Sequence, residues 1–225
     1  AELAADLVAR CAQFDAGDTE AAMNLLRNYQ KEVTLRVAAA DLVHALPLVK
    51  VSDRLTWLAE VILNQALVFA CAEMREQYGT PLRADDTPAA FAVIAYGKFG
   101  GIEMGYSSDL DLVFLHDCDA LESESTGGAR AINNGVYFSR LAQRLINWLA
   151  TQTPAGRAYE VDMALRPNGG SGLLVTSFSS FATYQRGHAW TWEHQALTRA
   201  RLVAGDEALG KIFNTLRAEI LTRPR

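Results

Sequence analysis

The chain contains few cysteines, only Cys11, Cys71 and Cys118 in 225 residues. Their odd number and wide spacing exclude a disulfide framework, and the lack of a Cys-x-x-Cys pair argues against a zinc site. A catalytic cysteine would need a lowered thiol pKa, and nothing near these three provides one. We therefore expect three buried, unreactive thiols in a protein of the reducing cytoplasm.

Long hydrophobic runs are also missing. The run from Val61 to Ala72 has twelve residues without charge, whereas a helix that crosses a bilayer needs about 20. We read this run as part of a buried helix and expect no membrane partner.

No apolar leader with a cleavage site opens the chain, and it begins at Ala1 without a Met, so we expect a truncated fragment of a longer chain.

Clusters of basic residues are absent, and the net charge is -5. Binding to a phosphate backbone depends on clustered Lys and Arg side chains. The scattered basic residues therefore weigh against nucleic acid as the main partner. A content of 50% hydrophobic and 21% charged residues is typical of a folded globular protein.

The N-terminal third has helical periodicity. Apolar residues recur at intervals of three and four up to Tyr78, and three helices are the simplest account. Pro47 stands where the second helix should stop, and Ser52 or Asp53 can cap the third. Gly79 should end that third helix.

The spacing of apolar residues changes after Pro88, which indicates that a new structural unit begins there. Three segments have the length or the alternation of strands: Phe91–Tyr96, Asp109–His116 and Tyr159–Arg166. The remaining segments have helical periodicity: 130–151, 179–185, 191–201 and 206–221. The sequence thus predicts a mainly helical α+β protein with a small mixed sheet. We divide it into an N-terminal helical region (1–85), a core (86–176) and a C-terminal helical segment (177–225).

Two carboxylates stand at the start of the second predicted strand. Alternate side chains of a strand share a face, so Asp109 and Asp111 project together while Leu110 and Leu112 project to the other side. Two adjacent carboxylates repel unless a cation lies between them, and oxygen ligands suit Mg²⁺. By spacing alone, a plain solvent-exposed strand edge remains an equal alternative.

Residues that can hold phosphate precede this pair. Ser107 and Ser108 offer hydroxyls and turn amides, and we expect Gly100 and Gly101 to open a helical turn whose amides form an anion site. A glycine pair alone usually means only a tight turn. The order strand, Gly-Gly, Ser-Asp-x-Asp is more specific and favours a phosphate and a metal ion side by side.

The third predicted strand supplies a third acid. Glu160, Asp162 and Arg166 fall on one face, so Asp162 can join Asp109 and Asp111 if this strand pairs beside the second. Arg166 would then reach phosphate or ribose, whereas the role of Glu160 stays open. The alternative is a salt bridge between Arg166 and one of the two acids.

These motifs resemble a known family. The Gly-Gly, Ser-Asp-x-Asp and later Asp pattern is similar to the polymerase-beta-like nucleotidyltransferase fold. More narrowly, three segments resemble the bifunctional glutamine synthetase adenylyltransferase/adenylyl-removing enzymes. They are Gly97–Leu115, Tyr159–Pro167 and Ala189–Leu197.

The resemblance implies an enzyme that transfers AMP from ATP to a tyrosine hydroxyl of glutamine synthetase. It implies Asp109, Asp111 and Asp162 as ligands of two Mg²⁺ ions, with Lys98 beside the polyphosphate and the PII signalling protein as regulator. The Trp-Glu-His-Gln-Ala-Leu segment and the following Arg-Ala-Arg resemble the C-terminal, adenylylating half. Phe99 departs from the leucine of the family pattern, which is an apolar exchange.

Three other functions remain open. The first is the reverse chemistry, phosphorolysis of AMP-tyrosine that releases ADP, and the second is a non-catalytic module that binds PII. A nucleotidyltransferase for small molecules or RNA is disfavoured by the charge and by the specific resemblance.

Overall fold

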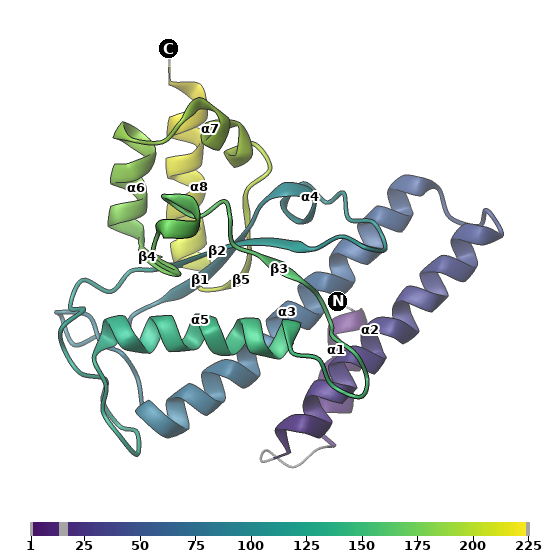
Figure 1. Ribbon diagram of the computed structural model, residues 1–225, viewed down its shortest axis with the longest axis horizontal. Helices are drawn as coiled ribbons and strands as arrows, with labels where there is room; N and C mark the ends of the chain where they lie inside the picture. The colour runs from purple at the N-terminus through teal and green to yellow at the C-terminus, as the bar shows by residue number, and fades with distance from the viewer. Residues whose placement is uncertain (1, 14–17, 224–225) are drawn as a thin grey trace.

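Three helices begin the chain, as predicted. The computed structural model describes residues 2–13 and 18–223, and its first helices are α1 (Glu2–Cys11), α2 (Thr19–Leu42) and α3 (Leu48–Tyr78) (Figure 1). Helices α2 and α3 form a long antiparallel hairpin.

The start of α3 differs from the prediction. Its N-cap is Pro47 rather than Ser52 or Asp53, so the helix begins five residues before Asp53. Proline suits the first turn of a helix because the N–H that it lacks has no partner there. The predicted end is confirmed, since Gly79 adopts φ 77° at the C-cap.

Five strands of the described part of the chain form one mixed sheet. They are β1 (Phe91–Ala95), β2 (Leu110–His116), β3 (Val161–Asp162), β4 (Val175–Ser177) and β5 (Arg201–Gly205), in the order β3-β2-β1-β5 with β4 also paired to β2. Strands β2 and β5 flank β1 in antiparallel fashion, whereas β3 and β4 run parallel to β2. The predicted α+β class with a small mixed sheet is confirmed.

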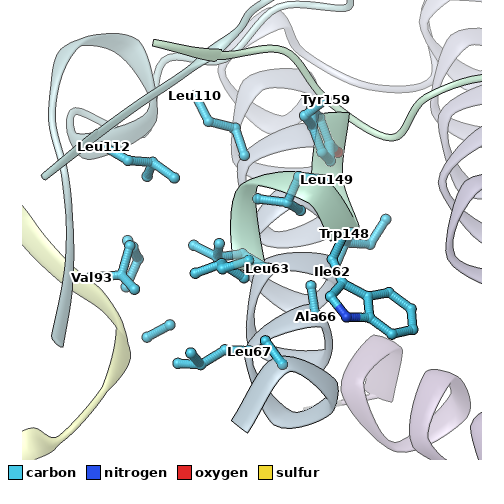
Figure 2. Packing of buried hydrophobic residues seen from close by; sticks show 14 of the residues in the cluster. Ile62, Leu63, Ala66, Leu67, Val93, Leu110, Leu112, Trp148, Leu149 and Tyr159 are labelled. Atoms are coloured by element: carbon cyan, nitrogen blue, oxygen red, sulfur yellow. The ribbon is translucent and has the colours of Figure 1, made fainter. Parts of the chain in front are cut away.

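Helices cover both faces of the sheet (Figure 1). One face packs on α3 and on α5 (Asn134–Ala150), and Figure 2 shows Val93, Leu110 and Leu112 turned toward α3 residues such as Leu63. The other face packs on α6 (Phe178–Gly187), α7 (Thr191–Leu197) and α8 (Glu207–Thr222). The alternation of strand side chains thus separates two apolar layers.

Two strand predictions were wrong. The third strand comprises only Val161–Asp162 because the Asp162 side chain accepts a hydrogen bond from the Ala164 amide (2.7 Å) and turns the chain there. The segment 177–225 is not purely helical, since it contributes β5, which pairs with β1. The division into three domains stays a prediction.

Helix α3 is long and apolar enough, by length and composition alone, to cross a membrane. It serves here as the central helix of the core, because Ile62, Leu63, Ala66 and Ala70 have no exposed surface. The buried helix expected for residues 61–72 is thus confirmed.

Candidate active site

The first two predicted carboxylates lie at the start of β2. Asp109 is exposed and directly precedes the strand, and Asp111 is half-buried within it. Leu110 and Leu112 point into the layer formed with α3 and α5, as predicted. Asp111 therefore belongs to the opposite face, which α6, α7 and α8 cover farther along the strand.

The third carboxylate stands beside them. In the parallel pair of β2 and β3, Asp111 is the register partner of Asp162. The Leu110 amide donates to the Glu160 carbonyl (2.9 Å), which fixes this register. The predicted condition that the third strand pairs beside the second is thus confirmed.

Burial and two neighbouring acids change the electrostatics of Asp111. Its pKa is raised above the ordinary value, chiefly by burial and then by the charges of Asp109 and Asp162. The nearby charge of Lys98 acts in the opposite direction. The site is therefore short of positive charge.

This donor set suits a hard divalent cation. Carboxylate oxygens are the ligands that Mg²⁺ prefers, and a cation would relieve the repulsion around Asp111. Within residues 2–13 and 18–223, no three His, Cys, Asp or Glu side chains already converge closely enough to hold an ion. The register brings the strand of Asp162 beside that of Asp111, and the role of Asp109, Asp111 and Asp162 as Mg²⁺ ligands stays a prediction.

A glycine that the sequence reasoning did not single out shapes this site. Gly97 begins α4 (Gly97–Gly100) with φ 53°, and a Cβ built on it would lie 2.1 Å from Oδ2 of Asp111. The Asp111 carboxylate therefore lies against the Gly97 backbone. Its position in the sequence, between the first predicted strand and Lys98, could have indicated a role in the site.

The expected role of the glycine pair needs correction. Gly100 is the last residue of α4 and Gly101 its C-cap, so they close the turn rather than open it. Their amides donate to the carbonyls of Tyr96 (2.7 Å) and Gly97 (3.0 Å) and are not free for an anion. Gly100 is required for another reason, since a Cβ there would lie 2.0 Å from the Arg199 carbonyl oxygen.

The serine pair lies in the loop that leads to Asp109. Ser107 is exposed, and the Ser108 hydroxyl accepts a hydrogen bond from the Gly105 amide (2.9 Å). Tyr106 donates to Asp41 on α2 (2.8 Å), which ties this loop to the helical hairpin. A contact of the two serines with nucleotide stays a prediction.

The two predicted basic residues differ in their surroundings. Lys98 is exposed on α4, close enough to act on Asp111. The Arg166 guanidinium instead donates to the carbonyls of Met163 (2.7 Å), Gly170 (3.0 Å) and Gly172 (3.3 Å). As found, Arg166 braces the turn after β3, and its role toward phosphate stays a prediction.

Glu160 forms its ion pair away from the three acids. It pairs with Arg157 (2.8 Å) on the surface, and both side chains are more than half exposed. Among the described residues, no salt bridge joins Arg166 to Glu160 or Asp162, although sequence reasoning had left that pairing open.

Comparison with known proteins gives a consistent result along the whole chain. The family described as glutamate-ammonia ligase adenylyltransferase matches residues 1–216. A protein of Pseudomonas aeruginosa is 50% identical over 227 residues, and one of Pseudomonas syringae pv. tomato is 50% identical over 226, each covering 100% of this chain. Both are named bifunctional glutamine synthetase adenylyltransferase/adenylyl-removing enzyme, and the chain spans 23% of their length.

Proposed function

The chain belongs to the glutamate-ammonia ligase adenylyltransferase family, and from this premise we propose that it transfers AMP from ATP to a tyrosine hydroxyl of glutamine synthetase. The tyrosine oxygen attacks the α-phosphate, a new P–O bond forms, and pyrophosphate leaves. The modification lowers nitrogen assimilation.

One observation carries the proposal for the site. Asp162 is the register partner of Asp111, so a parallel strand pair brings the acid of β3 to the acids at the start of β2. Transfer of a nucleotidyl group needs metal cations beside the polyphosphate, and carboxylates are the side chains that hold such cations. Asp109, Asp111 and Asp162 offer those carboxylates.

The acceptor proton needs a base. A phenol has a pKa of about 10, so its ionisation at pH 7 costs about 4 kcal/mol. Asp162 is exposed, and one of its oxygens already accepts from the Ala164 amide. We assign the other oxygen as the acceptor of the tyrosine proton. Lys98, exposed at the start of α4, neutralises part of the polyphosphate charge.

Asp109, Asp111 and Asp162 would hold two Mg²⁺ ions. The ions would supply Lewis-acid stabilisation of the charge that develops during transfer. Around them, the residues of this chain orient the substrates. Burial holds Asp111 in place, and α4 presents Lys98.

The adenylylating direction is supported by the Ala189–Leu197 motif and the Arg-Ala-Arg that follows it. The second candidate is removal of AMP by phosphorolysis with release of ADP, because the relatives carry both activities in their name. A non-catalytic module that binds PII is the third. PII is the proposed regulator of the full-length enzyme, and neither nucleic acid nor membrane is a proposed partner.

A cytoplasmic location is proposed from the cysteines. All three are free thiols. Burial raises the pKa of Cys71 to about 11, so this thiol stays protonated and unreactive at neutral pH.

The direct test is transfer of label. The protein is incubated with Mg²⁺, unmodified glutamine synthetase and ATP labelled at the α-phosphate, beside Asp111→Asn. Asp86→Asn serves as the matched control, because Asp86 is exposed in a turn at φ 60°, which Asn also adopts.

We expect label in glutamine synthetase with the parent and with Asp86→Asn, and none with Asp111→Asn. ADP released from adenylylated glutamine synthetase and phosphate would identify the reverse chemistry instead. Full transfer by Asp111→Asn would refute the assigned site. A parent protein that binds PII but not ATP would favour the regulatory module.

A further inference from the structure

A segment from the C-terminal part of the chain lies against α4. The carbonyl oxygen of Arg199 lies 2.0 Å from where a Cβ on Gly100 would stand, so the two backbones touch directly. Two residues later, Arg201 opens β5 and pairs with Ala95 at the end of β1. The Arg-Ala-Arg motif is thus placed beside the turn that follows β1.

Arg201 holds this turn through its side chain. Its Nε donates to the Gly100 carbonyl (3.0 Å) and its Nη2 to the Phe99 carbonyl (3.1 Å). The guanidinium lies over the Phe99 ring, 5.8 Å from the centroid, and pairs with Glu60 of α3. The last carbonyls of a helix lack partners within the helix. Arg201 supplies a donor to the Gly100 carbonyl and adds a second donor to the Phe99 carbonyl, which also accepts from the Ile102 amide (3.4 Å).

The other end of α4 contacts the Asp111 carboxylate. Asp111 Oδ2 lies against the backbone of Gly97, and the Tyr96 amide donates to the Asp111 carbonyl (2.9 Å). Lys98 lies within electrostatic reach of Asp111. Since α4 has only four residues, a displacement at its last carbonyls is passed on to Gly97 and Lys98.

We infer that Arg201 is a positioning residue that fixes α4 between α3 and β5, and thereby sets Gly97 and Lys98 against Asp111. This inference rests on the proposed function for its effect on catalysis. It assigns to Arg201 no contact with substrate. Lysine cannot replace it, because a single ammonium group lacks the planar fork that reaches both carbonyls and Glu60.

The test compares Arg201→Lys with Arg186→Lys. Arg186 is also part of a two-point pair with a glutamate, donating to Glu219 at 2.9 and 2.7 Å, but it joins α6 to α8. Two quantities are measured for both variants and the parent. They are the steady-state kinetics of AMP transfer, and hydrogen–deuterium exchange of the amides in residues 97–105.

For Arg201→Lys we expect kcat to fall about 10- to 100-fold, the KM for ATP to rise, and the KM for glutamine synthetase to stay unchanged. Exchange should accelerate within residues 97–105 and not in α8. Arg186→Lys should match the parent in the kinetics of AMP transfer and in the hydrogen–deuterium exchange of residues 97–105. A loss of folded protein would instead lower kcat alone, because the remaining folded enzyme keeps its KM values.

Two outcomes would overturn the inference. The first is that Arg201→Lys leaves both the exchange of residues 97–105 and the kinetics of AMP transfer unchanged. The second is that Arg201→Lys accelerates amide exchange evenly over the whole sheet. If the parent transfers no AMP, the proposed function fails. The exchange of residues 97–105 then still decides whether Arg201 fixes α4, so the two failures are distinguishable.

Discussion

Asp162 stands next to Asp111 in the sheet, although the whole of α5 separates them in the chain. Strand β3 has only two residues, and Asp162 is one of them. The strand therefore has little length beyond what this juxtaposition requires. A two-residue strand contributes few hydrogen bonds to the sheet, so its main effect is to bring the third acid to the start of β2.

Neutralising Asp162 should abolish turnover without loss of the fold. Asn at this position keeps the oxygen that accepts from the Ala164 amide, so only the charge is removed. We expect AMP transfer by Asp162→Asn to fall at least about 100-fold, as for loss of a general base. Circular dichroism and thermal unfolding should match the parent.

Glu160→Gln is the matched control for that substitution. Glu160 lies two residues away and forms an exposed ion pair with Arg157, and such pairs contribute about 0–1 kcal/mol. Its transfer rate should stay within about threefold of the parent, because its charge is screened by water. An equal loss in both variants would mean that the site responds to net charge rather than to Asp162 itself.

Gly97→Ala should disable the site more than its backbone strain explains. Gly97 has φ 53°, where a non-glycine residue costs about 1–2 kcal/mol, and its Cβ would collide with Asp111 Oδ2. We expect a lower melting temperature and about 100-fold slower transfer, since Asp111 must move. Gly127→Ala is the control for the backbone strain alone. Gly127 has φ 83°, and no atom lies within 4 Å of a Cβ built on it.

Equal kinetics in these two glycine variants would contradict the contact between Gly97 and Asp111. A loss of transfer in Gly97→Ala alone, with both variants destabilised to a similar degree, would establish it. The comparison is made by thermal unfolding and by AMP transfer at a temperature where both variants are folded.

Much of this arrangement could be predicted because its signals are local. The alternation within β2 separates Asp111 from Leu110 and Leu112 without knowledge of the fold. The period changes near residue 88, and each long helix has enough turns to establish its pattern. Asp162 could be proposed as a partner only on the condition that its strand paired with β2, and the structure met that condition.

The remaining features depend on contacts that no local pattern contains. β5 is a short apolar run that periodicity cannot distinguish from a helix, and it is a strand only because β1 lies beside it. Arg201 and Gly100 are 101 residues apart in the chain. Gly100 looked like part of an anion site because the sequence does not show that the Arg199 backbone covers it.

Stability should fall on acidification because of His116. This side chain is buried, stacks on Phe138 with ring centroids 4.5 Å apart, and has a pKa lowered to about 4, chiefly by burial. The unfolded chain binds the proton near pH 6.5. The contribution of neutral His116 to the free energy of unfolding is therefore fully present above that pH and is lost as the pH falls toward 4. The loss should reach at most about 3 kcal/mol.

The measurement is urea unfolding between pH 7.5 and pH 4.5 for the parent and for His116→Asn. Asn can keep an acceptor for the Cys118 amide, which His116 Nδ1 now binds at 3.1 Å, but it does not titrate. The variant should therefore show a flatter pH dependence. His44→Asn is the control, since His44 is exposed at φ 55° and should leave the parent slope unchanged.

Arg27 should be the most costly arginine to replace. It has no exposed surface, and its guanidinium donates to the carbonyls of Thr151 (2.6 Å), Gly156 (2.7 Å) and Met23 (2.8 Å). Methionine keeps much of the volume but donates no hydrogen bond, so three hydrogen bonds from a charged group are lost, although the Gly156 carbonyl keeps the Thr153 amide as a donor (2.9 Å). A hydrogen bond to a charged group contributes about 1.5–3 kcal/mol, so we expect Arg27→Met to lose about 3 kcal/mol or more.

The same substitution at Arg36 separates burial from charge. Arg36 lies on the same helix, but its side chain is 67% exposed and, among the described residues, it pairs only with Glu32 four residues earlier. Arg36→Met should change the free energy of unfolding by less than about 1 kcal/mol. Arg27 also ties α2 to the loop that leads into β3, so Arg27→Met should speed hydrogen exchange in residues 151–162. If exchange there stays slow while stability falls, Arg27 holds the helices together but not the strand that carries Asp162.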